Sequence, residues 1–268
     1  MTRHLIRLDA ADDFDGWRSA ARSLAAAEVP ADQILWQVGD QPADLFAPAP
    51  RPLPTPTRAL TVPKGFLPLA RSALLHRDPE RFALLYALLL RVARQPGLLH
   101  DKTDPLRRRI DALAQTVHRD MHKMHAFLRF REMSTDTGPR YVAWFEPDHH
   151  ITRANAGFFV GRFATMHWSI LTPDTSLHWD TETLRQGPGA SVQDAAPGDP
   201  LEEVWKAYYA AIFNPARLNP KAMLSEMPKK YWKNLPEAAL IPDLIAGARA
   251  REIEMIDRSR NAALAPRR

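Results

Sequence analysis

Hydrophobic and polar positions divide the N-terminal part of the chain into two short strands around one helix. Residues 4–8 and 34–38 are short, mostly apolar runs and are predicted as strands. Between them, Phe14, Trp17 and Leu24 recur with the spacing of one helical face, after aspartates that can cap a helix. This order predicts a right-handed crossover or a small α/β flap.

From residue 64 to residue 130 the pattern is helical and predicts three helices. Asp78-Pro79 and Asp104-Pro105 should begin the second and the third, because aspartate caps a helix and proline fits its first position. The third helix has one apolar stripe, made of Ile110, Leu113, Ala114, Val117, Met121, Met124 and Leu128. We expect the three helices to pack as a local bundle.

Strand-like patterns return at residue 141. Residues 141–145 are predicted as a strand, and residues 168–179 as a β-hairpin with a four-residue loop. In that hairpin, Trp168 should lie opposite Trp179 and Ser169 opposite His178. A helix over residues 152–163 should turn Phe158, Phe159 and Phe163 inward.

The whole pattern predicts an α+β fold, mostly helical, with a small antiparallel sheet from residues 141–179 that the N-terminal strands could join. Residues 187–198 are predicted as a loop or mobile segment. Helices are predicted over 199–213 and 236–256, with a short helix and turn over 223–232. Prolines crowd the region before residue 58, and proline removes a donor and fixes φ, so an extended connector is expected. The predicted division is 1–41 as a small α/β element, 42–58 as a Pro-rich linker, 59–256 as the main α+β domain and 257–268 as a basic tail.

Composition narrows the class of protein. The 268 residues include no cysteine, which excludes disulfides, thiolate zinc sites and cysteine-bound iron–sulfur clusters. The sequence shows no transmembrane run and no signal peptide, so we expect a cytoplasmic protein. The net charge of +5 is uneven: residues 1–50 carry four arginines against eight acids, and residues 205–233 carry six cations against Glu226. Such a basic region favours a polyanion such as nucleic acid, or serves solubility alone.

Histidines follow the apolar stripe of the long predicted helix. His118, His122, His125 and Arg129 recur at i, i+4, i+7 and i+11, on one helical stripe. Histidines one turn apart can share a metal ion, but the glutamate of the His-Glu-x-x-His pattern is missing. Lys123 and Arg129 oppose a dication and favour a phosphate. We therefore predict no metal and no cofactor, and an edge that faces an anion.

A second segment interleaves cations with aromatic rings. Arg217, Lys229 and Lys230 can contact phosphates, and Trp232 can stack on a base. In the alternative interpretation, Trp232 and Tyr231 are core anchors and the lysines form a solvated face. With the histidine helix as the other wall, this segment predicts a nucleic-acid-binding groove.

A predicted turn at residues 146–150 combines carboxylates with imidazoles at the end of a strand. Glu146 and His149, with His122 and His125, are the candidate catalytic residues, because such groups suit acid–base chemistry or a metal ion. A hydrogen-bonded structural turn would explain the same residues. The chain has no P-loop, no G-x-G-x-x-G and no G-x-S-x-G motif, so nucleotide hydrolysis and esterase chemistry lose support.

Five motifs carry a resemblance to a protein family. They are HKMHAFLRFRE at 122–132, YVAWFEPDH at 141–149, WSILTP at 168–173, FNPAR at 213–217 and MPKKYW at 227–232. Together they resemble a bacterial family of unknown function that is labelled as DNA-metabolism or DNA-repair proteins. In that family the gene commonly lies beside one for a radical S-adenosylmethionine (radical SAM) protein. Some members are fused to a uracil-DNA glycosylase-like domain.

The resemblance implies a nucleic-acid-binding accessory protein in DNA repair or DNA modification. Its partners would be DNA and a radical SAM or uracil-DNA glycosylase-like protein, and any iron–sulfur chemistry would belong to that partner. The resemblance supplies no catalytic residues. Two alternatives remain open: a metal-assisted hydrolase or lesion-processing enzyme that uses the His/Glu cluster, and a scaffold that docks a radical enzyme or a glycosylase.

Overall fold

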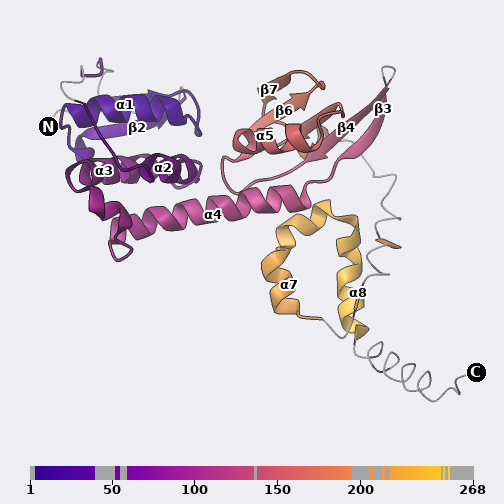
Figure 1. The fold of residues 1–268 in the computed structure, drawn as a ribbon. Helices are drawn as coiled ribbons and strands as arrows, with labels where there is room; N and C mark the ends of the chain where they lie inside the picture. The colour runs from indigo at the N-terminus through magenta and orange to yellow at the C-terminus, as the bar shows by residue number, and fades with distance from the viewer. Residues whose placement is uncertain are drawn as a thin grey trace, which may run out of the picture. The chain divides into compact units, whose positions relative to one another are not determined.

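The computed structural model divides into two compact units, and each is described by itself (Figure 1). The first comprises Met1–His125 and Glu146–Phe159, and the second Ala126–Phe145 and Val160–Arg268. Seven α-helices and seven strands lie within the described residues. The described residues are 4–39, 52–54, 59–135, 138–194, 206–207, 210, 213–214, 218–248, 250 and 253.

The first unit begins with a two-stranded parallel sheet of β1 (His4–Leu8) and β2 (Ile34–Val38). The strands are joined by α1 (Phe14–Ala26). Asp13 caps this helix, because its carboxylate accepts a hydrogen bond from the backbone N–H of Gly16 at 2.8 Å. Two successive strands can be parallel only when the chain crosses back between them, so the predicted crossover is confirmed.

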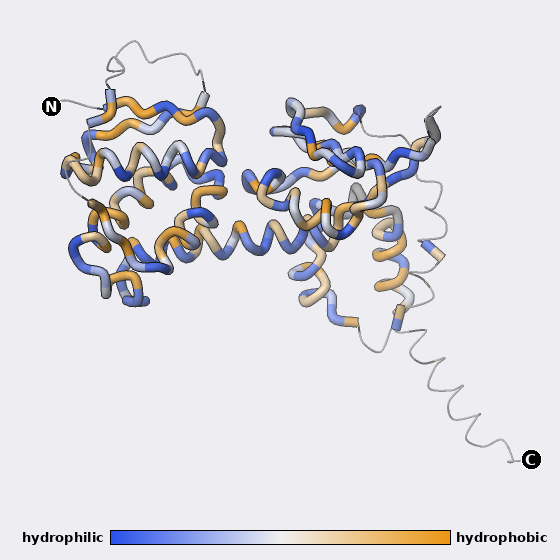
Figure 2. Tube along the Cα trace, turned by 45° about the horizontal axis from the view of Figure 1, so that its top comes forward, coloured by the Kyte–Doolittle hydropathy of each residue, from blue (hydrophilic) through white to orange (hydrophobic). Residues whose placement is uncertain are grey.

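Three helices follow, as predicted: α2 (Phe66–Leu74), α3 (Arg81–Arg94) and α4 (Pro105–Phe127). Asp104 precedes α4, and its carboxylate accepts a hydrogen bond from the backbone N–H of Arg107 at 2.9 Å. Along α4, hydrophobic and hydrophilic residues alternate, which Figure 2 shows as alternating orange and blue. The cap-then-proline signal therefore located the start of the long helix correctly.

One hydrophobic core joins the N-terminal element to these helices. Within it, Trp17 donates an Nε1 hydrogen bond to the carbonyl of Phe82 at 3.3 Å, and the Tyr86 hydroxyl donates to the carbonyl of Val29 at 2.7 Å. Both aromatic side chains are almost fully buried, so their polar atoms need such partners. Most of the predicted linker, 42–58, lies outside the described residues, and the division into domains stays a prediction.

The second unit contains a five-stranded sheet in the order β3-β4-β5-β6-β7. Its strands are β3 (Arg131–Thr135), β4 (Gly138–Trp144), β5 (Trp168–Leu171), β6 (Thr175–Trp179) and β7 (Leu184–Pro188). β4 and β5 are parallel, whereas the other neighbours are antiparallel. The α+β class and the helical majority are confirmed, but the prediction of a purely antiparallel sheet is wrong. The N-terminal strands form a separate sheet.

The chain between β4 and β5 explains their parallel pairing. It contains α5 (Thr152–Arg162), and a helical connection of this length lets the next strand run in the same direction. The hairpin that follows has the predicted register, with Trp168 opposite Trp179 and Ser169 opposite His178.

One local prediction is wrong, and one predicted boundary differs by two residues. Phe158 was expected to point inward with Phe159, but Phe158 is 43% exposed whereas Phe159 is buried. The loop predicted over 187–198 instead begins with the end of β7, which pairs with β6. Proline at position 188 is compatible with this strand because β7 is the last in the sheet order, where no further strand needs its N–H.

Short helices make up the C-terminal part of the described chain. α7 (Pro220–Glu226) is followed by two 3-10 turns, Lys229–Asn234 and Pro236–Leu240, and by α8 (Ile241–Ala246). The single helix predicted over 236–256 therefore begins as a 3-10 turn. Within the parts of the chain described, no helix combines the length and the apolar character needed to cross a membrane.

Two further predictions lie outside the described residues. The helix predicted over 199–213 is described only at Lys206, Ala207, Ala210 and Phe213, and the basic tail at 257–268 is not described.

Candidate functional site

α4 carries the predicted histidine stripe in the first unit. Its apolar stripe is buried, as predicted, at positions such as Ile110 and Met124. Beside it, His118 and His122 are exposed, while His125 and Lys123 are half-buried. His118 Nε2 lies 3.0 Å from the hydroxyl of Ser72 in α2, so this imidazole is already engaged by a neighbouring helix.

Arg129 does not continue the stripe. α4 ends at Phe127, so the i+11 position lies beyond the helix. The Arg129 guanidinium donates a hydrogen bond to the carbonyl of Ala126 at 2.9 Å and lies 3.9 Å from the carboxylate of Glu237, which is 7% exposed. Placing Arg129 on the histidine stripe is therefore wrong, and within the second unit this side chain ties the helix end to the C-terminal segment.

His125 is held by residues of α5 that belong to the same unit. Its Nε2 lies 2.9 Å from the amide oxygen of Asn155, whose amide nitrogen donates to the sulfur of Met124 at 3.1 Å. In this orientation the amide oxygen accepts from an Nε2–H of His125. The imidazole also stacks on Phe158, with ring centres 3.7 Å apart. Burial lowers the pKa of His125, so the ring is neutral near pH 7.

His149 forms a close pair with His76, with ring centres 4.2 Å apart. His149 Nδ1 accepts a hydrogen bond from the backbone N–H of Arg77 at 3.4 Å, and His76 Nδ1 accepts from that of Asp78 at 2.8 Å. A nitrogen that accepts carries no proton, so both rings are neutral with the proton on Nε2. Burial, followed by the charge of His76, lowers the pKa of His149 to about 4, and burial also lowers that of His76. With a pKa that low, His149 is not a general base suited to pH 7.

Asp120, which the sequence did not single out, fastens the turn that carries His149. Its carboxylate is 4% exposed and accepts a hydrogen bond from the backbone N–H of His149 at 2.9 Å. The next backbone N–H, of His150, donates to the carbonyl of Leu75 at 2.8 Å. Glu146 is half-buried at the start of the turn. These contacts favour the structural interpretation of the turn over the catalytic one.

The four candidate catalytic residues are not shown to form one cluster. His125 contacts Asn155 and His149 contacts His76, while His122 is exposed. Across the described ranges, no group of three or more histidine, aspartate or glutamate side chains is arranged to hold a metal ion. The enzymatic alternative stays a prediction, and no metal-binding group within the described residues supports it.

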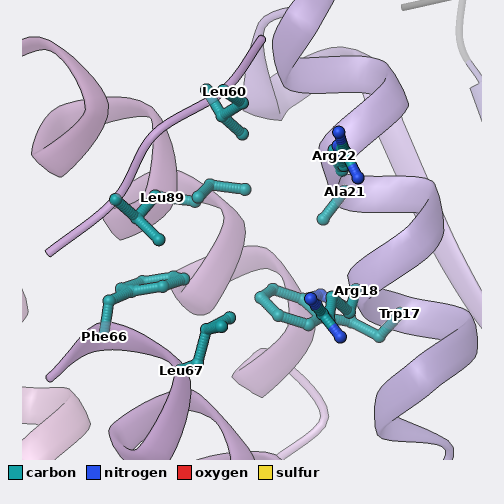
Figure 3. Close-up of a pocket in the computed structure, with 9 residues that line it drawn as sticks. Trp17, Arg18, Ala21, Arg22, Leu60, Phe66, Leu67 and Leu89 are labelled. Atoms are coloured by element: carbon teal, nitrogen blue, oxygen red, sulfur yellow. The ribbon is translucent and has the colours of Figure 1, made fainter. Parts of the chain in front are cut away.

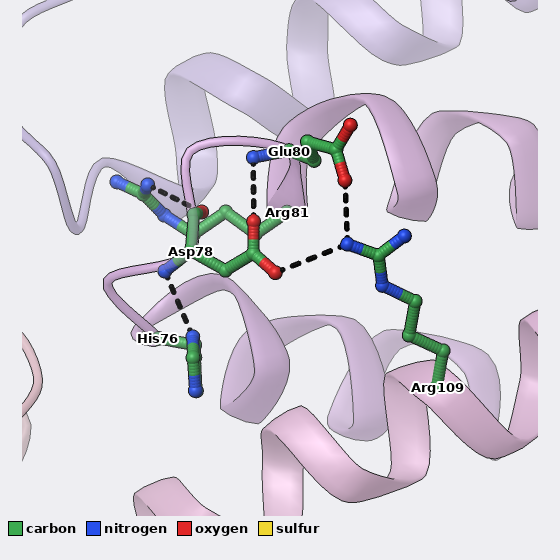
Figure 4. Close-up of polar contacts among 5 residues, drawn as sticks. All are labelled: His76, Asp78, Glu80, Arg81 and Arg109. Atoms are coloured by element: carbon green, nitrogen blue, oxygen red, sulfur yellow. Dashed lines mark hydrogen bonds and ion pairs between the residues drawn. The ribbon is translucent and has the colours of Figure 1, made fainter.

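Carboxylates engage several cations of the first unit. Figure 4 shows Asp78 just before α3, where its side chain accepts from the backbone N–H of Glu80 at 2.8 Å. Arg109 Nη2 lies 3.3 Å from the other Asp78 oxygen and 2.5 Å from the Glu80 carboxylate. Such cations already have anionic partners within the fold.

The second predicted basic segment is partly described. Arg217 lies outside the described residues. Lys229 Nζ lies 5.9 Å from the ring centre of Trp232, and Lys230 Nζ lies 4.5 Å from that of Tyr231. Both lysines are exposed.

The two aromatic rings of this segment serve the interior of the second unit. Tyr231 is 4% exposed and stacks with Phe127 and Phe145, at 5.3 and 5.4 Å between ring centres. Trp232 is half-buried, and its Nε1 donates to the carbonyl of Met227 at 3.0 Å. Tyr231 is therefore a core anchor. Of these two rings, Trp232 is the one that is partly exposed to solvent.

The five-stranded sheet carries a polar row that the sequence did not reveal. One residue from each strand lies beside the next in this order: Arg131, Val142, Ser169, His178 and Arg185. Successive residues of a strand point to opposite faces of the sheet. The sequence neighbours of this row, such as Ile170 and Leu177, therefore lie on the other face, where they are fully buried. Arg140 lies two positions from Val142 and therefore on the same face. We call this surface the polar face.

A chain of hydrogen bonds fixes His178 at the middle of the polar face. The Ser176 hydroxyl donates to the carbonyl of Pro188 at 2.9 Å, so its oxygen is left to accept from His178 Nε2 at 3.0 Å. The proton then resides on Nε2, and Nδ1 accepts from the Ser169 hydroxyl at 2.8 Å. Burial, then the charge of Arg140, lowers the pKa of His178. The middle of the row is therefore neutral, and the arginines supply its charge.

The groove predicted from the sequence draws on both units. His118, His122, Lys123 and His125 belong to the first, whereas Arg129, Lys229, Lys230 and Trp232 belong to the second. Their convergence on one groove therefore stays a prediction. The polar face, by contrast, lies entirely within the second unit.

Comparison with known proteins gives one match. The model of the family DUF4130, a domain of unknown function, matches residues 79–237. The matched region is more than half of the chain and includes α3, α4, α5 and the whole five-stranded sheet. No curated protein and no solved structure shows a significant match to the chain. The chain belongs to the DUF4130 family.

Proposed function

We propose that this DUF4130 protein is a nucleic-acid-binding accessory protein that holds DNA on the polar face of its five-stranded sheet. The row from Arg131 to Arg185, with Arg140 beside it, is the observation that supports the proposal. Neighbouring strands are about 4.8 Å apart, so five strands span roughly 19 Å. A phosphate backbone of several nucleotides has that length, and it would meet positive charge on both sides of a neutral centre.

Arg140 and Arg185 are the arginines best suited to phosphate. Both side chains are exposed, and they lie on strands β4 and β7, on either side of the neutral centre of the polar face. Arg185 pairs with Asp180 at 3.1 Å, but its side chain is 72% exposed, and an exposed pair contributes at most about 1 kcal/mol. A phosphate can therefore replace Asp180 at little cost, and the planar guanidinium can bind two of its oxygens.

The proposal further places the protein in DNA repair or DNA modification, beside a radical SAM or uracil-DNA glycosylase-like partner. This part rests on the resemblance of the motifs at 122–132, 141–149 and 227–232. Affinity purification of the full chain from its native cells, followed by mass spectrometry, tests it. We expect one of these two partner classes to be enriched. Recovery of neither class would contradict the accessory role but not DNA binding, which is measured separately.

DNA binding is tested by fluorescence anisotropy with labelled single-stranded and duplex DNA of about 20 nucleotides, between about 50 and 200 mM salt. We expect the logarithm of the affinity to fall linearly with the logarithm of salt concentration, since bound cations release counterions. The double variant Arg140→Gln/Arg185→Gln should lower the affinity severalfold and reduce the slope by about two, because each phosphate contact contributes about one.

Arg162→Gln is the matched control, because Arg162 is an exposed arginine in the last turn of α5. It should change neither the affinity nor the slope. Failure to bind at low salt, or binding without salt dependence, would contradict the proposal. An equal loss in the control would show that charge in general, and not the polar face, binds DNA.

A further inference from the structure

The first unit contains a cavity that the nucleic-acid proposal does not use. It has a volume of about 230 Å³ and lies among α1, α2, α3 and the segment just before α2 (Figure 3). Ala21 and Trp17 line it from α1, while Phe66 and Leu89 face them across the space. Its walls are therefore mostly hydrocarbon.

Among the described residues that line the cavity, no buried polar side-chain atom is left to bind a polar ligand. The one polar side-chain atom among its buried lining residues is Trp17 Nε1, which already donates to the carbonyl of Phe82 at 3.3 Å. Burying an amide or hydroxyl without a hydrogen bond is unfavourable by several kcal/mol in apolar surroundings, about 2–7 by transfer measurements. The part of a ligand that enters should therefore be apolar.

Two arginines stand at the mouth. Arg18 and Arg22 are exposed residues of α1, four positions apart, and both line the cavity. Residues at this spacing are neighbours on one helix surface. Among the residues described, neither guanidinium has a hydrogen-bond or ion-pair partner, in contrast to Arg81 and Arg109 of the same unit. An apolar cavity with two such cations at its mouth matches a molecule with an apolar body and an anionic head.

We propose that this cavity binds a small amphipathic anion, with its hydrocarbon body inside and a carboxylate or phosphate held by Arg18 and Arg22. An apolar cavity of about 150 Å³ is known to hold benzene, so the present cavity accepts a somewhat larger body, such as a medium-length alkyl chain. A nucleobase fits less well, because its edges would find no hydrogen-bond partners inside. The site is thus independent of DNA binding on the polar face.

Matched ligands test the proposal in the full-length protein. Octanoate, octyl phosphate, 1-octanol and octylammonium share the same chain and differ in the head group, and ligand-detected NMR titration compares their affinities. We expect both anions to bind at least fivefold more tightly than the alcohol, and the ammonium compound most weakly. The order of octanoate and octyl phosphate identifies the preferred head group. Equal binding of alcohol and anions, or no binding of either anion, would overturn the proposal.

Variants locate the binding. Arg18→Gln/Arg22→Gln should remove the preference for anions and leave octanol binding within twofold, because the apolar walls are unchanged. Ala21→Leu should fill the cavity and weaken all four ligands at least tenfold, with circular dichroism confirming that the variant folds. Arg108→Gln, at an exposed position of α4, should behave as wild type. Retained anion preference in the double-arginine variant would contradict the site even if Ala21→Leu failed to fold.

Discussion

Two regions of the molecule use arginine in opposite ways: the junction of α2 and α3 in the first unit, and the polar face in the second. In the first unit, Arg81 is 4% exposed, and its guanidinium donates hydrogen bonds to three carbonyl groups. They belong to Leu74, Asp78 and Ala11, at 2.8, 3.0 and 3.0 Å respectively. This arginine joins the end of α2, the start of α3 and the loop before α1. Its charge contributes to the fold and is not available to a ligand.

In the second unit, strands carry Arg140 and Arg185 side chains into solvent on the polar face. The backbone hydrogen bonds of the sheet are made between strands, so these side chains are not needed to complete them. The contrast shows that a count of basic residues is a poor guide to a polyanion site. What matters is whether the fold already uses the donors of each cation.

The largest expected effect tests whether Arg81 is structural. Arg81→Gln removes hydrogen bonds to three carbonyl groups in a buried site, and it should lower the free energy of unfolding by about 3 kcal/mol. Urea denaturation followed by circular dichroism measures the loss. Arg108→Gln, at an exposed position of α4, should stay within about 0.5 kcal/mol of wild type. Similar losses in both variants would remove the distinction between used and available arginines.

The next effect concerns the aromatic rings of the second unit. Tyr231→Leu should lower the free energy of unfolding by about 2 kcal/mol, because Tyr231 is buried against Phe127 and Phe145. DNA affinity, measured at a temperature where the variant is folded, should change less than twofold. A fivefold loss of affinity with unchanged stability would instead show that Tyr231 binds DNA and is not a core residue.

Acid should affect the first unit through its paired imidazoles. The pKa of His149 is about 4 in the folded chain and its ordinary value is 6.5, so the unfolded chain binds more protons between these values. Stability from this group is complete above about pH 6.5 and is lost as the pH falls toward 4. After allowance for its partial exposure, the loss should be about 1–2 kcal/mol. Lowering of the pKa of His76 acts in the same direction.

His149→Asn isolates this contribution, since an asparagine oxygen can still accept from the backbone N–H of Arg77. Urea denaturation at several pH values should give the variant a smaller loss of stability than wild type between pH 6.5 and 4. If wild type and variant lose the same stability between pH 6.5 and 4, titration of His149 does not cause the acid sensitivity.

Much of the fold follows from local patterns, while the candidate site depends on strand order. The stretch 168–179 is typical of a hairpin with a four-residue loop, and that loop length predicts the pairing of Ser169 with His178. A hairpin pattern carries no information on how its first strand pairs with an earlier one, so the parallel pair of β4 and β5 was missed. The polar face joins Arg131 to Arg185, residues 54 positions apart, through three intervening strands. Without the strand order, no local spacing identifies them as one surface.

The histidine helix shows a second limit. The spacing of His118, His122 and His125 correctly predicted that they lie on α4. It could not predict which side chains hydrogen-bond to them. The residue that fixes His125 is Asn155, which comes from another helix. Asp120 reads as one more charged residue of an exposed helix, although it is 4% exposed and fastens a distant turn. Burial of charged groups is set by tertiary contacts that periodicity does not encode.

The smallest expected effect asks whether the centre of the polar face is neutral, like the ring of His149 in the first unit. In wild type, ¹⁵N NMR of His178 should show the proton on Nε2, because the Ser176 hydroxyl is committed to Pro188 and can only accept from the ring. Ser176→Ala removes both hydrogen bonds and should cost about 1 kcal/mol of stability. It should also let the proton redistribute between the ring nitrogens. A wild-type ring protonated on Nδ1 alone would be neutral but would contradict this chain of hydrogen bonds. A doubly protonated ring at pH 7 would place charge in the middle of the row, and His178 would then bind phosphate alongside the arginines.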